Sequence, residues 1–128
     1  MLKDQLKNYH IILASSSPRR QSFFKDLGID FEIRLKPVDE TYPPTLTSYE
    51  ISNYLAELKA LPFKEELIEK DILITSDTIV WHKNQALGKP KDLNEAFQMI
   101  KSLSNQTHEV ITSICFTTQT SQKTVHNS

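Results

Sequence analysis

Eight polar and charged residues of this chain are of types that together could act on a phosphate chain. They are two acids, two lysines, two arginines and two hydroxyl residues: Ser15, Arg19, Arg20, Glu40, Lys59, Asp77, Thr78 and Lys89. Mg²⁺ usually takes one or two carboxylates together with phosphates and waters, which Glu40 and Asp77 could supply. Cationic side chains offset the charge that builds up on phosphoryl oxygens. The set therefore predicts a metal-assisted attack on a phosphoanhydride.

The stretch Ser15–Arg20 is the clearest candidate for a phosphate site. It follows the apolar run Ile11–Leu13, which is typical of a buried strand, and Ser17 and Pro18 are good residues for a helix start. A helix start presents free backbone N–H groups, and arginine side chains match phosphate oxygens bidentately. The alternative is an ordinary strand, turn and helix with solvated arginines, and these residues alone do not decide between the two.

The other candidates also have purely structural interpretations. Asp77 directly follows the apolar stretch 72–76, where loops commonly carry function. Glu40 lies in a proline-rich loop and Lys59 late in a predicted helix, both ordinary positions for a surface residue. Lys89 follows a glycine and could be a plain turn residue. No arrangement of a nucleophile and its base can be inferred from these positions.

Hydrophobic patterns predict alternating strands and helices. The predicted strands span 11–13, 31–35, 72–76 and 110–117, and the predicted helices 18–27, 47–61 and 92–103. We expect the first helix to bury Phe23, Phe24 and Leu27, and the second Ile51, Tyr54, Leu55 and Leu58. The polar stretch 117–128 is expected to be a loose tail. Together the elements predict a single α/β domain over residues 1–128, with ligands at the carboxyl ends of its strands.

Charge and cysteine content narrow the partners and the compartment. Fifteen lysines and arginines against sixteen acids give a net charge of −1, so we expect no nucleic-acid partner. No apolar run is long enough for a membrane span. The single cysteine, Cys115, lies in an apolar run, as expected for a buried thiol in a reducing compartment, and we predict a cytoplasmic protein. Four scattered histidines argue against zinc.

Five blocks of the sequence, in this order, resemble the Maf family of nucleoside triphosphate pyrophosphatases. They are Leu13–Arg20, Tyr54–Ala60, Ser76–Val80, Leu87–Pro90 and Leu103–Val110. The resemblance implies a mixed twisted sheet flanked by helices, similar to the inosine-triphosphate pyrophosphatases. It also implies hydrolysis between the α and β phosphates, a house-cleaning role, Mg²⁺ or Mn²⁺ as cofactor, and a homodimer.

The same resemblance implies a role for each candidate residue. Asp77 matches the proton acceptor of the family, and Arg19 and Thr78 match positions tied to base choice. The other phosphate- and metal-site positions match Ser15, Arg20, Glu40, Lys59 and Lys89. Arg19 and Thr78 resemble the branch that acts on dTTP and UTP, and they argue against a purine-type enzyme acting on inosine or xanthosine triphosphate.

Family members continue beyond the last residue of this sequence, with a later Asp-Lys-Ala-Gly block that nothing in 117–128 matches. The resemblance therefore implies a chain whose C-terminal part is absent. Two alternatives to a pyrophosphatase stay open at this point. One is a non-catalytic nucleotide-binding regulator of septum formation, and the other is an inactive fragment.

Overall fold

The computed structural model describes residues 8–82, 85–87, 93–94 and 109–127. The elements in chain order are β1 (His10–Leu13), α2 (Pro18–Asp26), β2 (Phe31–Ile33), α3 (Tyr49–Ala60), the 3₁₀ helix η1 (Leu61–Glu66), β3 (Asp71–His82), β4 (Gln85–Leu87), β5 (Glu109–Thr117) and β6 (Gln122–Asn127). No helix in these ranges is long and apolar enough to cross a membrane. The helix predicted over 92–103 lies outside the described residues apart from residues 93 and 94.

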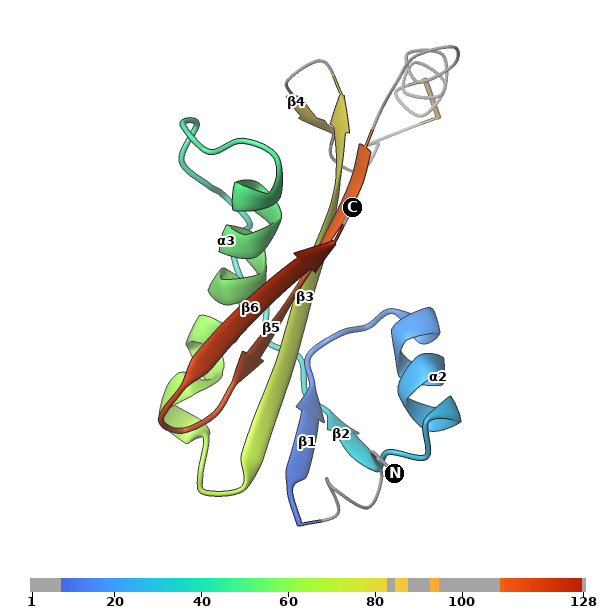
Figure 1. The fold of residues 1–128 in the computed structure, drawn as a ribbon, viewed down its shortest axis with the longest axis vertical. Coiled ribbons are helices and arrows are strands. Elements are labelled where there is room, and N and C mark those ends of the chain that lie inside the picture. The colour runs from blue at the N-terminus through green and yellow to red at the C-terminus, as the bar shows by residue number, and fades with distance from the viewer. Residues whose placement is uncertain (1–7, 83–84, 88–92, 95–108, 128) are drawn as a thin grey trace.

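The strands form one mixed sheet in the order β2-β1-β3-β5-β6, with β4 also paired to β3. Strand β1 runs parallel to both β2 and β3, whereas β4, β5 and β6 extend the sheet by antiparallel pairing. Figure 1 shows α3 and α2 on opposite sides of the long strand β3. The predicted α/β class, a mixed sheet flanked by helices, is therefore confirmed.

Helix α3 is fixed to the sheet by both apolar and polar contacts. Ile51 and Leu55 are buried against Ile79 of β3 and Ile111 of β5, because their spacing places them on one face of the helix. Tyr54 was expected on this stripe, but it is 39% exposed and the prediction is wrong. The neighbouring Leu55 takes the buried position on this face of the helix.

Two buried contacts of hydroxyl groups fix the position of α3 along the sheet. Thr75 Oγ1 donates to the carbonyl of Ala56 over 2.6 Å. Ser52 Oγ and Ser113 Oγ lie 2.6 Å apart between α3 and β5. Because unpaired polar groups are costly in a buried interface, sliding α3 along the sheet would break both contacts at once.

Helix α2 begins as the sequence predicts but packs less deeply. Ser17 caps it by accepting the backbone N–H of Arg20 over 3.4 Å, and proline opens its first turn. Phe24 packs against the core cluster of β1 and β3, whereas Phe23 and Leu27 are exposed. The expected three-residue stripe is therefore wrong. The helix meets the sheet through Phe24, and a cavity lies between the helix and the sheet.

Strand β3 joins the predicted strand 72–76 and the predicted extended residues 79–81 into one continuous strand. It does not end at Ser76 but continues through Asp77 and Thr78 to His82, because β5 pairs with it as far as Trp81. Cross-strand pairing supplies partners for the polar residues that a sequence pattern assigns to a loop.

The chain after residue 117 also differs from prediction, because β6 replaces the expected loose tail. Thr118 and Ser121 close a hairpin in which the Thr118 N–H donates to the Ser121 carbonyl over 2.8 Å. Strand β6 then contacts α3, where His126 stacks on Tyr49 with ring centroids 4.2 Å apart. The pairing with β5 and the stacking on Tyr49 together explain why this polar segment forms a strand.

Candidate functional site

The site forms at a gap in the sheet beside β3. On one edge of β3, β1 pairs with residues 71–74 and β4 with residues 80–82. Between them, residues 75–79 have no strand partner on this edge among the described residues. The last contact from the β1 side is the Ala14 N–H, which donates to the Ile74 carbonyl over 3.0 Å. The chain then leaves the sheet through the serine loop, so Ser15–Ser17 lie beside this open edge.

Side-chain alternation along β3 sends neighbouring residues to opposite faces. Thr75 and Asp77 face α3, where they contact Ala56 and Lys59. Ser76 and Thr78 line a cavity on the α2 face. Asp77 and Thr78, adjacent in the sequence, therefore serve different parts of the site.

Lys59 joins the two candidate acids. Its ammonium, carried by the last turn of α3, donates to Asp77 Oδ1 over 3.0 Å and to the Ser76 carbonyl over 3.1 Å. Glu40 Oε1 also lies 3.0 Å from the same nitrogen. The Glu40 and Asp77 oxygens are therefore no more than twice that distance apart, although they come from a loop and a strand.

The Asp77 carboxyl group is buried, with 11% of its side chain exposed. Burial raises the pKa of Asp77 above its ordinary value, and the nearby Glu40 adds to this rise. Hydrogen bonding and charge from Lys59 act against this rise in pKa, with a smaller opposing contribution from Arg20. The second oxygen, Oδ2, is buried and has no hydrogen-bond partner among the described residues. Such a group can accept a proton or coordinate a cation.

The serine loop, Ser15–Ser17, lines an open cavity, the loop cavity, of about 690 Å³. Ser15 is 8% exposed, and its Oγ accepts the backbone N–H of Ser17 over 3.2 Å. Gln21 holds the loop from α2 by donating to the Ser15 carbonyl over 2.9 Å. The residues that line the loop cavity and carry polar or charged side chains are Ser15, Ser16, Ser17, Arg20, Lys36, Glu40, Lys59 and Ser76. Hydroxyls, cations and a helix start on one wall suit a phosphate chain.

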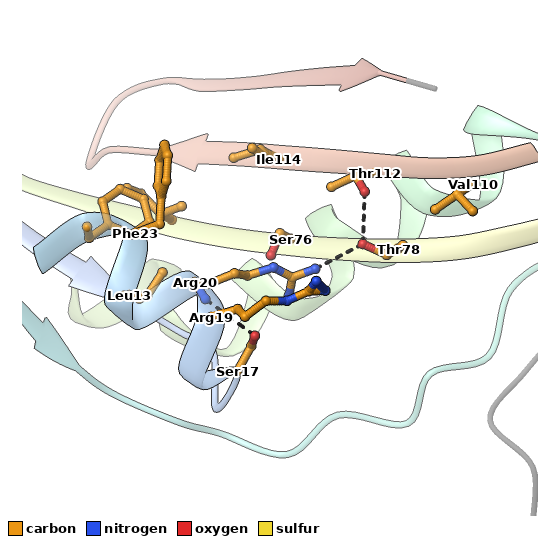
Figure 2. Close-up of a pocket in the computed structure, with 12 residues that line it drawn as sticks. Leu13, Ser17, Arg19, Arg20, Phe23, Ser76, Thr78, Val110, Thr112 and Ile114 are labelled. Atoms are coloured by element: carbon orange, nitrogen blue, oxygen red, sulfur yellow. Dashed lines mark hydrogen bonds between the residues drawn. The ribbon is translucent and has the colours of Figure 1, made fainter. Parts of the chain in front are cut away.

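The second cavity, the α2 cavity, lies between α2 and the strands β3 and β5 and has a volume of about 410 Å³. Figure 2 shows Arg19 and Arg20 reaching from α2 toward Thr78. Arg20 Nη2 donates to Thr78 Oγ1 over 2.9 Å, and Thr78 Oγ1 lies 3.0 Å from Thr112 Oγ1 of β5. Apolar walls with a few polar groups of this kind suit a flat ring that carries hydrogen-bonding edges.

A divalent cation fits the acidic side of the site. No cluster of three or more acidic, histidine or cysteine side chains able to hold a metal occurs in the described part of the chain. Mg²⁺ does not require such a cluster, because it keeps several waters and binds one or two carboxylates plus substrate phosphates. Glu40 is half exposed and lines the loop cavity, and Lys59 links it to Asp77, whose buried Oδ2 has no partner among the described residues. These two residues are the ones that could hold the ion.

The structure brings seven of the eight predicted site residues to one region. Lys59 links Glu40 and Asp77, and the two cavities bring in Ser15, Arg19, Arg20 and Thr78. Lys89 lies outside the described residues. Sequence reasoning missed Lys36 and Thr112, which also line the cavities. The only signal for Thr112 was its place in the predicted strand 110–117, and nothing marked Lys36.

Solved structures share this fold. The Ham1 protein of Staphylococcus aureus matches with a TM-score of 0.63 at 17% identity, over 91% of this chain and 68% of that chain. A HAM1 protein of Coxiella burnetii matches with a TM-score of 0.53 at 17% identity, over 92% of this chain and 69% of that chain. At such identities the likeness concerns the fold alone.

Curated relatives are much closer in sequence. The dTTP/UTP pyrophosphatase of Flavobacterium johnsoniae is 67% identical over 99% of this chain, and that of Christiangramia forsetii is 54% identical over 100% of it. A dTTP/UTP pyrophosphatase of Bacteroides fragilis is 45% identical over 92% of the chain. The chain spans 66%, 65% and 62% of the length of these three relatives, respectively.

The match to a protein family covers nearly the whole sequence, because the model described as Maf-like protein matches residues 10–128. These residues include β1, the serine loop, the Lys59–Asp77 pair and both cavities. The chain therefore belongs to the Maf family.

Proposed function

We propose that this protein is a nucleoside triphosphate pyrophosphatase that hydrolyses dTTP and UTP to the monophosphate and pyrophosphate, in a house-cleaning role. The observation that carries the proposal is the Lys59 ammonium, held between Glu40 and Asp77 beside the serine loop. The names of the relatives, dTTP/UTP pyrophosphatases at 54% and 67% identity, support the same activity and substrates.

In this proposal Asp77 accepts the proton of the attacking water. A general base works best when its pKa lies near the working pH, and burial raises the pKa of Asp77 in that direction. Lys59 keeps the carboxylate charged and oriented by donating to Oδ1. Lys89 is assigned a phosphate-contacting role from the family resemblance.

We assign Glu40 and Asp77 as the residues that hold Mg²⁺ or Mn²⁺. An ion held there would supply positive charge that offsets the negative charge of the phosphate oxygens. The support is the pair of carboxylates around Lys59 and the unpartnered Asp77 Oδ2. Ser15 and Arg20 bind the phosphate chain from the other wall of the loop cavity, through a hydroxyl and a guanidinium.

Base choice is assigned to the α2 cavity. Arg19 and Thr78 line it, and a guanidinium and a hydroxyl can both hydrogen-bond a pyrimidine edge. Arg20 and Thr112 fix the Thr78 hydroxyl oxygen in place. The support for pyrimidine substrates is this donor set and the names of the relatives.

Two further parts of the proposal concern the compartment and the oligomeric state of the protein. We place it in the cytoplasm, which the free buried thiol of Cys115 supports. A homodimer is proposed from the family resemblance.

The experiment compares Asp77→Asn with wild type for pyrophosphate release from dTTP. Hydrolysis by D77N should fall by at least about a hundredfold, because a general base contributes 10²–10⁴-fold. Binding of a non-hydrolysable dTTP analogue should largely survive, since Asn keeps an oxygen that can accept from Lys59. Asp30→Asn, at an exposed aspartate, is the matched control. Equal turnover by D77N and wild type would remove Asp77 from the mechanism.

A further inference from the structure

Lys36 lines the loop cavity together with Ser15, Arg20 and Lys59, although it belongs to none of the sequence blocks that mark the site. It lies in the loop after β2, three residues past the end of that strand. The cavity thus has a second lysine, and the surroundings of the two ammonium groups differ.

Lys59 is already occupied by protein oxygens. Its ammonium has three close oxygen neighbours, on Ser76, Asp77 and Glu40, at 3.0–3.1 Å. A lysine ammonium has three N–H donors and no acceptor. The neighbours of Lys59 therefore match its donors in number, and its main task is to hold the two carboxylates.

The Lys36 ammonium has fewer protein acceptors among the described residues than it has N–H donors. Its ammonium donates to Glu66 Oε2 over 2.6 Å and to the Pro62 carbonyl over 3.1 Å. It also lies 5.2 Å from the centroid of the Phe63 ring, and Phe63 lines the same cavity. These contacts leave one of the three N–H donors unassigned and hold the charge in a fixed place. A cation positioned in advance loses less conformational freedom when it binds an anion.

The place of Lys36 indicates which part of a nucleotide it meets. The loop cavity and the α2 cavity share Ser17, Arg20 and Ser76. A nucleotide that occupies both cavities would therefore cross from one to the other at these residues. Lys36 lines the loop cavity and is not among the residues of the α2 cavity. It therefore lies toward the end of the nucleotide that is farther from the base.

We propose that Lys36 is a substrate-binding residue that contacts the two terminal phosphates, the part that leaves as pyrophosphate. The inference rests on the proposed function, because it takes the loop cavity as the phosphate site. The two lysines then have different roles: Lys59 holds the two carboxylates in place, and Lys36 binds the leaving group.

Inorganic pyrophosphate is the direct probe, since its binding needs no turnover. Isothermal titration with Mg²⁺ present compares wild type, Lys36→Met and Glu66→Gln. K36M keeps the length of the side chain and removes its charge, so its affinity should fall about tenfold or more, as for a lost hydrogen bond between charged groups. E66Q breaks the Lys36–Glu66 ion pair but keeps the ammonium, so its affinity should be unchanged or higher.

A merely structural role for Lys36 predicts the opposite pattern. If the ion pair with Glu66 is what matters, E66Q and K36M weaken pyrophosphate binding alike, and that result overturns the proposal. Wild-type affinity in K36M, or no measurable binding of pyrophosphate by wild type, also overturns it. Pyrophosphate binding that depends on Lys36 in a protein that hydrolyses no triphosphate would refute the proposed function and leave the Lys36 site standing. Circular dichroism establishes that each variant is folded.

Discussion

Replacing Lys59 by methionine tests the ion-pair cluster that organises the site. The substitution keeps the apolar stem of the side chain and removes two hydrogen bonds and an ion pair. Asp77 would then be buried with neither carboxylate oxygen paired, because Oδ2 already has no partner among the described residues. A lost hydrogen bond to a charged group costs about 1.5–3 kcal/mol. Since 26% of the Lys59 side chain is exposed, solvent screening places the expected loss in the lower half of that range.

The loss of stability in K59M should depend on pH. Lys59 lowers the pKa of Asp77, while burial and Glu40 raise it, so without Lys59 the folded-state pKa rises further. The unfolded carboxyl group titrates near 3.9. A group with a raised folded-state pKa contributes its stability below the unfolded pKa and loses it as the pH rises through the folded pKa. The deficit of K59M should therefore be small at about pH 4 and larger at about pH 8.

Urea unfolding at these two pH values measures the effect. Adding Asp77→Asn to K59M removes the buried charge, so the double variant should regain most of the stability that K59M loses at the higher pH. Lys64→Met, at an exposed lysine of η1, is the control for a lost lysine charge. A loss in K59M that is equal at both pH values and is not relieved by D77N would refute this account of the cluster.

Two further variants test the base site and the register of α3. Arg19→Ala should lower the preference for dTTP over CTP, measured as the ratio of kcat/KM values, by about tenfold, while pyrophosphate affinity changes little; an unchanged ratio would remove Arg19 from base choice. Thr75→Val should lower the free energy of unfolding by about 1–2 kcal/mol, because it removes the buried hydrogen bond to the Ala56 carbonyl, and Thr75→Ser should restore most of it. Wild-type stability in T75V would show that this contact does not fix α3.

The local part of the site could be predicted from the sequence. Ser17 and Pro18 mark the start of α2, and the apolar run before them marks β1, because capping and burial depend on nearby residues. The grouping of Asp77 with Ser15–Arg20 was also predicted, from the rule that ligands bind at the carboxyl ends of strands. The actual reason differs, since Asp77 lies within a long strand beside the point where β1 stops.

Features that depend on distant parts of the chain were not predicted. Strand β6 exists because a polar segment pairs with β5 and stacks on Tyr49, which no local pattern records. Phe23 is exposed because Phe24, the neighbouring residue of α2, is the one that packs against the core beside β1 and β3. Lys36 reaches the loop cavity through contacts with η1, about thirty residues later in the chain.

The most direct test of the central claim is pyrophosphate release by this chain from dTTP, UTP, dUTP, CTP, GTP and ITP, with Mg²⁺ or Mn²⁺. The account predicts selective release from dTTP and UTP, with the monophosphate as the second product. Release of orthophosphate instead would contradict cleavage between the α and β phosphates. No release from any nucleotide, by a sample that circular dichroism shows to be folded, would contradict the claim that the Lys59–Asp77–Glu40 cluster in this chain is catalytic.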